Sequence, residues 1–162
     1  MLKPGDKAPA FSLPGSDGGK HTLAQLGAKR LVLYFYPKDA TPGCTVQAQG
    51  IRDHLAAFGK LGATVVGVSP DSVEKHARWV EKEKLGFLLL SDEDHAVAEK
   101  YGVWAEKTLY GKKFMGIVRS TFVIEDGKVT SAEYKVSPKG HAEGLVEKLS
   151  GKAPAATKKP AK

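Results

Sequence analysis

A chain of 162 residues, 41% hydrophobic and with a net charge of +7, fits one globular domain that buries its own core. Its longest apolar run, Leu31 to Tyr36, is far shorter than the roughly 20 residues that a membrane helix needs. One cysteine cannot form an internal disulfide, so the sequence argues against both a membrane-spanning protein and a disulfide-stapled secreted domain.

The positive charge is concentrated at the C-terminal end. Residues 151–162, GKAPAATKKPAK, contribute four of the net seven charges and contain no acidic residue. We expect residues 1–150 to form one domain and residues 151–162 to form a disordered Lys/Ala/Pro-rich tail. A solubilising tail is the simpler interpretation, and weak attraction to polyanions is the alternative. The weakly basic body predicts no nucleic-acid partner.

The first third of the chain predicts a hairpin and a buried strand. The segments 11–13 and 20–22 flank a turn rich in Gly, Ser and Asp, which is typical of a β-hairpin. The start of the chain lacks the apolar segment of a secretory signal, so we expect a cytoplasmic protein without membrane partners. The continuous apolar run 31–36 predicts a central strand buried on both faces, which ends at Pro37.

The middle of the chain alternates helical and extended patterns. Apolar residues at helical spacing follow Pro42 and Gly43 as far as Leu61. After that helix, the pattern predicts a strand over 63–69, a helix over 72–85, a strand over 87–90 and a helix over 92–101.

The C-terminal part predicts a second hairpin and a closing helix. The segments 120–124 and 128–134 are joined by Glu-Asp-Gly, and the Asp-Gly pair marks a tight β-turn. A helix follows over 139–150. The whole order predicts a thioredoxin-like three-layer α/β/α sandwich with a central mixed sheet, because strands that alternate with helices form a parallel core.

Cys44 is the candidate for chemistry. It follows the buried strand and a loop, and it lies at the predicted start of a helix. The first turn of a helix has unpaired backbone N–H groups and a partial positive charge, and both favour a thiolate over a thiol. A small buried apolar residue is the competing interpretation of a lone cysteine.

The segments around Cys44 resemble one known family. Pro37, Thr41 and Cys44 stand at the P-x-x-x-T-x-x-C spacing of the peroxiredoxins. The string FYPKD through TPGCT is similar to the bacterioferritin-comigratory-protein, or peroxiredoxin Q, branch. Further segments match that branch in order and spacing, so that the resemblance runs from about residue 3 to 149: 5–11, 67–71 and 119–124.

The resemblance implies a thiol-dependent peroxidase that reduces hydrogen peroxide and organic hydroperoxides through a sulfenic acid on Cys44. It implies that Thr41 hydrogen-bonds the peroxide, that Pro37 shields the thiolate from water, and that Arg119 holds the thiolate and the peroxide oxygens. An arginine suits this role because its fixed charge and five donors match a developing oxyanion. Without the resemblance, a solvated charge at a strand end would be the preferred interpretation of Arg119.

The sequence departs from the resemblance at Gln49. Many relatives carry a resolving cysteine at this position, five residues after the first, and others carry it on the following helix. This chain has neither. We therefore expect resolution by an external thiol: thioredoxin, glutaredoxin, a small thiol or a second Cys44. An alternative explanation of Gln49 is an engineered substitution, in which this glutamine replaces a resolving cysteine of the natural protein.

We expect no metal, haem or flavin cofactor. The five histidines show no ligand-like spacing, and we expect each at the surface or partly buried: His21, His54, His76, His95 and His141. Two other functions remain open. A thiol-disulfide oxidoreductase on the same fold would prefer Cys-x-x-Cys, but Thr41 stands where its first cysteine would be. The second open function is that of a non-catalytic binding module with a basic tail.

Overall fold

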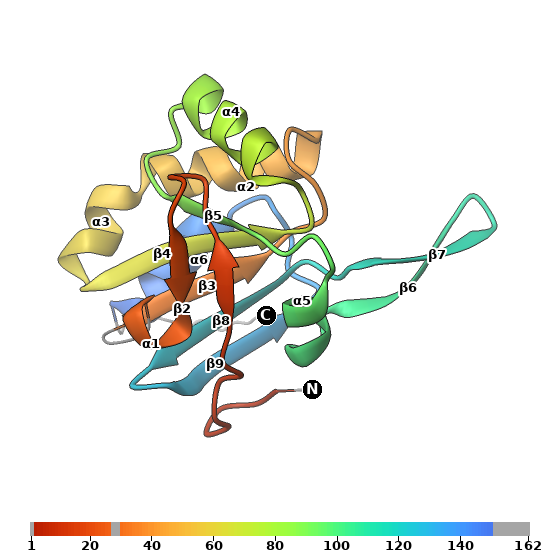
Figure 1. Cartoon of the computed structure of the whole chain (residues 1–162). Helices are drawn as coiled ribbons and strands as arrows, with labels where there is room; N and C mark the ends of the chain where they lie inside the picture. Colours follow the sequence, from red (N-terminus) through yellow and green to blue (C-terminus); the bar gives the residue numbers. More distant parts are fainter. Residues whose placement is uncertain (1, 27–29, 151–162) are drawn as a thin grey trace.

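The computed structural model describes residues 2–26 and 30–150 (Figure 1). The tail expected over residues 151–162 lies outside the described residues. Within the described part, no helix is long and apolar enough to cross a membrane.

A five-stranded mixed sheet forms the centre of the domain, in the order β5-β4-β3-β8-β9. Strands β3, β4 and β5 are parallel, whereas β8 runs antiparallel to both β3 and β9. The apolar run predicted as a central strand occupies the middle of this sheet. The strands are β3 (Arg30–Phe35), β4 (Ala63–Ser69), β5 (Leu88–Ser91), β8 (Ser120–Glu125) and β9 (Lys128–Tyr134).

Both faces of the sheet are covered, because successive side chains of a strand point to opposite faces. Val32, Tyr34 and Tyr36 pack under one layer of helices, made of α2 (Pro42–Asp53), α3 (Leu55–Lys60), α4 (Val73–Glu83) and α6 (His141–Leu149). The opposite face, with Leu31 and Leu33, is covered by β1 (Ser12–Pro14), β2 (Lys20–Thr22), α1 (Leu23–Leu26) and α5 (Ala96–Lys100). This arrangement confirms the predicted three-layer sandwich (Figure 1).

Two predicted helices differ in extent. The helix expected to run as far as Leu61 is interrupted at His54, which has φ −111° and ψ 11° and whose ring donates to the Gly50 carbonyl over 2.8 Å. The helix expected over 92–101 covers only α5. Asp92 is instead a capping residue, because its carboxylate accepts from the backbone N–H groups of Val97 and Ala98.

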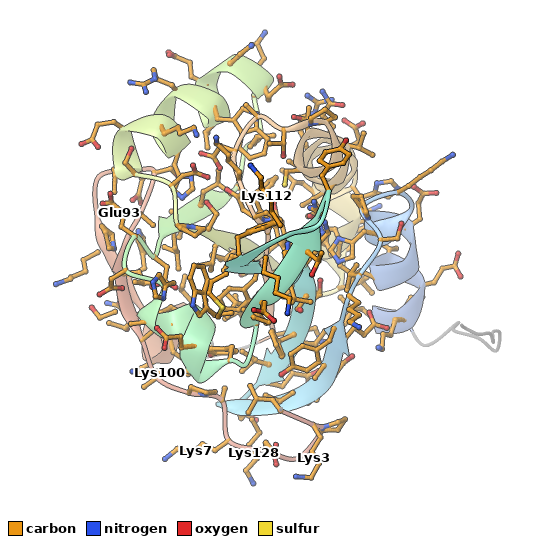
Figure 2. All side chains as sticks on the ribbon, turned by 90° about the vertical axis from the view of Figure 1, so that its right-hand side faces the viewer. Lys3, Lys7, Glu93, Lys100, Lys112 and Lys128 are labelled. Carbon is orange, nitrogen blue, oxygen red and sulfur yellow. The ribbon has the colours of Figure 1, made fainter. Side chains whose placement is uncertain are left out.

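The sequence patterns missed one hairpin, formed by β6 (Trp104–Leu109) and β7 (Lys112–Ile117). It projects from the body in Figure 1 and points toward the viewer in Figure 2, where Lys112 is labelled. Most of β7 is exposed, so it lacks the alternation that a half-buried strand shows. Its turn, Tyr110 and Gly111, has positive φ at both residues, as a tight hairpin turn requires.

Candidate active site

Cys44 lies in the first turn of α2, as the sequence predicts. Thr41 is the N-cap residue, Pro42 is the first helical residue, and Cys44 is the third. Proline is well placed there because the first N–H groups of a helix have no partner within the helix. The Cys44 side chain is buried, with a residue exposure of 1%. The unpaired N–H groups of this first turn therefore lie next to the thiol and carry partial positive charge.

Arg119 contacts Cys44 although 75 residues separate them in the sequence. Its Nη2 donates to Cys44 Sγ over 3.3 Å. The pairing of two strands brings these residues together. Ser120, which follows Arg119 and starts β8, pairs with Phe35 at the end of β3, and the loop that leads to Cys44 begins after Phe35. Gly43 leaves room for the guanidinium, since a Cβ atom at this position would lie 3.3 Å from Nη2.

A buried polar chain continues from Arg119 away from the thiol. Arg119 Nη1 donates to Gln47 Oε1 over 2.6 Å, and Gln47 Nε2 lies 3.2 Å from His141 Nδ1. The other ring nitrogen, Nε2, lies 2.7 Å from Thr121 Oγ1. The sequence analysis missed Gln47, His141 and Thr121. The one available signal was that Gln47 follows Cys44 by three residues, which places both on one helix face.

Thr41 and Pro37 lie on the loop that leads into α2. Both are partly buried. The Thr41 hydroxyl donates to the Lys38 carbonyl over 2.9 Å and does not cap the helix. The structure therefore brings Cys44 and Arg119 into direct contact, whereas Thr41 and Pro37 share the loop before Cys44 without a side-chain hydrogen bond to it among the described residues.

A second buried network holds this loop from the other side. Asp39, which is 2% exposed, accepts from the Tyr36 hydroxyl over 2.5 Å and lies 2.6 Å from His76 Nδ1. His76 Nε2 donates to the Leu90 carbonyl over 2.9 Å. The Asp39 backbone N–H donates to Asp71 over 2.7 Å. These bonds tie the loop to the segment between β4 and α4, to α4 and, through His76, to β5.

Asp39, Asp71 and His76 have the donor types of a metal site, and their nearest ligand atoms lie within 4.8 Å of one another. These three side chains already have hydrogen-bonding partners within the protein. The Lys75 ammonium lies 2.9 Å from Asp71 Oδ1 and supplies a positive charge. Burial raises the pKa of Asp71, but the Asp39 backbone N–H and Lys75 outweigh it and lower the pKa. The cluster fits an internal hydrogen-bond network better than a metal centre.

The expectation that every histidine is at the surface or partly buried is wrong for two of them. His76 is fully buried and His141 is 7% exposed. Each has both ring nitrogens in hydrogen-bonding contact, which is how a buried imidazole avoids the cost of an unpaired polar group. Burial, and then the charge of Arg119, lower the pKa of His141 to about 4.

This shift predicts that stability falls in mild acid. The unfolded chain binds a proton at His141 near the ordinary pKa of 6.5, whereas the folded chain resists it down to about 4. Through this group the free energy of unfolding should fall by about 2 kcal/mol between about pH 7 and pH 5. Urea unfolding at both pH values measures the drop, and His141→Asn should remove it. An equal pH dependence in the variant would contradict this account.

Comparison with known proteins places the chain among peroxide-reducing enzymes. The model of the AhpC/TSA family matches residues 4–132. The chain is 53% identical to peroxiredoxin Bcp of Escherichia coli K12 over 129 residues, which cover 79% of this chain and 83% of that protein. It is 49% identical over 150 residues to a putative peroxiredoxin of Mycobacterium tuberculosis, with coverages of 92% and 96%.

Solved structures agree with the sequence matches. Peroxiredoxin Q of Xanthomonas campestris superposes with a TM-score of 0.84 at 39% identity, over 93% of this chain and 96% of that one. The bacterioferritin comigratory protein from the same organism also superposes, with a TM-score of 0.84 at 38% identity and the same coverages. That structure is described as giving insights into the alkyl peroxide reduction activity of the protein. The matches confirm the thioredoxin-like sandwich and favour a peroxidase over a thiol-disulfide oxidoreductase or a non-catalytic binding module.

Proposed function

We propose that Cys44 is the residue that attacks peroxide, because the chain belongs to the AhpC/TSA family and, within it, to the Bcp/PrxQ peroxiredoxins. Peroxiredoxins are thiol-dependent peroxidases. The contact between Arg119 Nη2 and the buried Cys44 Sγ, at 3.3 Å, carries the proposal. A guanidinium at this distance stabilises a thiolate, and its remaining donors can meet the peroxide oxygens.

The reaction needs no cofactor for its electron balance. The Cys44 thiolate attacks the terminal oxygen of a hydroperoxide, the O–O bond breaks, and the other oxygen leaves as water or an alcohol after it takes a proton. Cys44 becomes a sulfenic acid, so sulfur is oxidised and the peroxide is reduced. One external thiol then displaces water to form a mixed disulfide, and a second thiol releases Cys44.

Thr41 and Pro37 complete the proposed site. The Thr41 hydroxyl, which now donates to the Lys38 carbonyl, lies one helical turn before Cys44 and would turn to hydrogen-bond the peroxide. Pro37 would exclude water from the thiolate, because its ring carries no donor and sits partly buried on the same loop. Hydrogen peroxide and organic hydroperoxides are the proposed substrates, and the alkyl peroxide reduction activity described for the similar Xanthomonas protein supports the organic ones.

We propose a one-cysteine mechanism that an external thiol resolves. Cys44 is the sole cysteine of the chain, and Gln49 occupies the position of a resolving residue. The Gln49 amide donates to Glu83 on α4 over 2.9 Å, so it has a structural contact of its own. The reductant would be a thioredoxin, a glutaredoxin or a small thiol. A reducing compartment such as the cytoplasm meets this requirement.

Graded oxidation tests the one-cysteine mechanism. One equivalent of peroxide should give a sulfenic acid that a dimedone-type reagent traps, because no second thiol competes for it within the chain. Excess peroxide should add two and then three oxygens to the monomer. Intact-mass spectrometry detects each product, and Cys44→Ser is the unmodified control. A covalent dimer as the dominant product at low protein concentration, with no oxidised monomer, would contradict the mechanism.

A further inference from the structure

The buried chain beyond Arg119 has only one consistent direction of hydrogen bonding. A guanidinium can only donate, so the group 2.6 Å from Arg119 Nη1 must be the oxygen of the Gln47 amide. The amide nitrogen of Gln47 therefore faces His141 Nδ1 and must donate to it. His141 Nδ1 then carries a lone pair, and the proton sits on Nε2, which donates to Thr121 Oγ1 over 2.7 Å.

This direction makes a neutral His141 a condition for the contact at the thiol. If Nδ1 carried a proton, the Gln47 amide would have to rotate and present its nitrogen to Arg119, where two donors would oppose each other. The surroundings favour the neutral ring. Tyr34 lies beside it with ring centroids 6.0 Å apart, and both burial and the positive charge of Arg119 lower the pKa of His141.

We propose that His141 is a positioning residue for the peroxidase reaction: with Thr121 it orients the Gln47 amide, which holds the Arg119 guanidinium against Cys44. Within the described part of the chain, His141 makes no hydrogen bond to Cys44, so it acts through Gln47 and Arg119. The proposal rests on the proposed roles of Cys44 and Arg119. It concerns the oxidation of Cys44 by peroxide and not the later attack of an external thiol.

A set of variants tests the proposal through the rate constant for oxidation of reduced Cys44 by hydrogen peroxide. His141→Phe keeps an aromatic ring but removes the acceptor for the Gln47 amide. It should slow oxidation by up to about tenfold, the upper end of the effect of one lost neutral hydrogen bond. His141→Asn should stay within about threefold of wild type, because Asn Oδ1 can take the place of Nδ1. Thr121→Val, of similar volume, should also slow oxidation.

The control separates positioning from stability. Leu145→Ala removes a buried apolar side chain from the same helix, so it should lower the melting temperature and leave the oxidation rate unchanged. In a Gln47→Leu background, His141→Phe should have no further effect on the rate, since its only route to the thiol is lost.

Three results would overturn the proposal. The first is a wild-type oxidation rate in both His141→Phe and Thr121→Val. The second is an effect of His141→Phe that persists unchanged in the Gln47→Leu background. The third is a reduced rate in Leu145→Ala equal to that of His141→Phe. A normal rate in Arg119→Met would instead show that the proposed role of Arg119 has failed, so the two failures are distinguishable.

Discussion

Replacing Cys44 with serine is expected to abolish thiol-dependent peroxide reduction. A serine hydroxyl is not ionised at neutral pH, and the chain has no other cysteine. The remaining sulfur atoms belong to two methionine thioethers, which cannot cycle through a sulfenic acid. Peroxide consumption by the purified protein, with dithiothreitol as the reductant, measures the effect.

A matched sulfur variant controls for this substitution. Met115 is half-exposed on the β6–β7 hairpin, so Met115→Leu removes a sulfur atom while Cys44 keeps its thiol. It should retain full activity. Peroxide consumption by Cys44→Ser near the wild-type rate would mean that another group reacts with peroxide and that the assignment of the nucleophile is wrong.

Replacing Arg119 with methionine is expected to have the second largest effect. The substitution removes the donor 3.3 Å from Cys44 Sγ and the partner of Gln47 Oε1 together. Loss of one preorganised donor to a developing oxyanion slows a reaction by about 10²–10³, and we expect a decrease of that size in the rate of Cys44 oxidation. Stopped-flow measurement of peroxide reacting with the reduced protein gives the rate constant.

Two further variants define what Arg119 contributes. Arg119→Lys keeps the charge but loses the two-pronged geometry, so its rate should fall between those of wild type and Arg119→Met. Arg78→Met changes an exposed arginine on α4 and should not alter the rate. An oxidation rate and a pH dependence of Cys44 alkylation that both stay at wild type in Arg119→Met would show that the contact of Arg119 with Cys44 has no role in the reaction.

The elements that carry the thiol could be predicted because their signals are local. The apolar run 31–36 becomes the central strand β3, and the Pro-Gly pair at 42–43 precedes Cys44 at the start of α2. The contact of Arg119 with Cys44 had no local signal. It depends on the antiparallel register of β8 against β3, so only the family resemblance placed both residues in one site.

The polar residues that the sequence analysis missed are buried for reasons that no local pattern reveals. His76 and His141 lie within apolar helix faces, and their burial is possible only because partners from distant segments, Asp39 and Thr121, satisfy their ring nitrogens. The β6–β7 hairpin was missed for the opposite reason. It buries little surface, so its residues carry no apolar periodicity.

The rate constant for the reaction of hydrogen peroxide with the fully reduced wild-type protein tests the central claim most directly. The claim is that the helix start and Arg119 activate Cys44 toward peroxide. Measured beside free cysteine at the same pH, Cys44 should react at least about a hundredfold faster, the low end of what one preorganised oxyanion donor provides. A rate constant equal to that of free cysteine would contradict the account, because an unactivated buried thiol would explain it equally well.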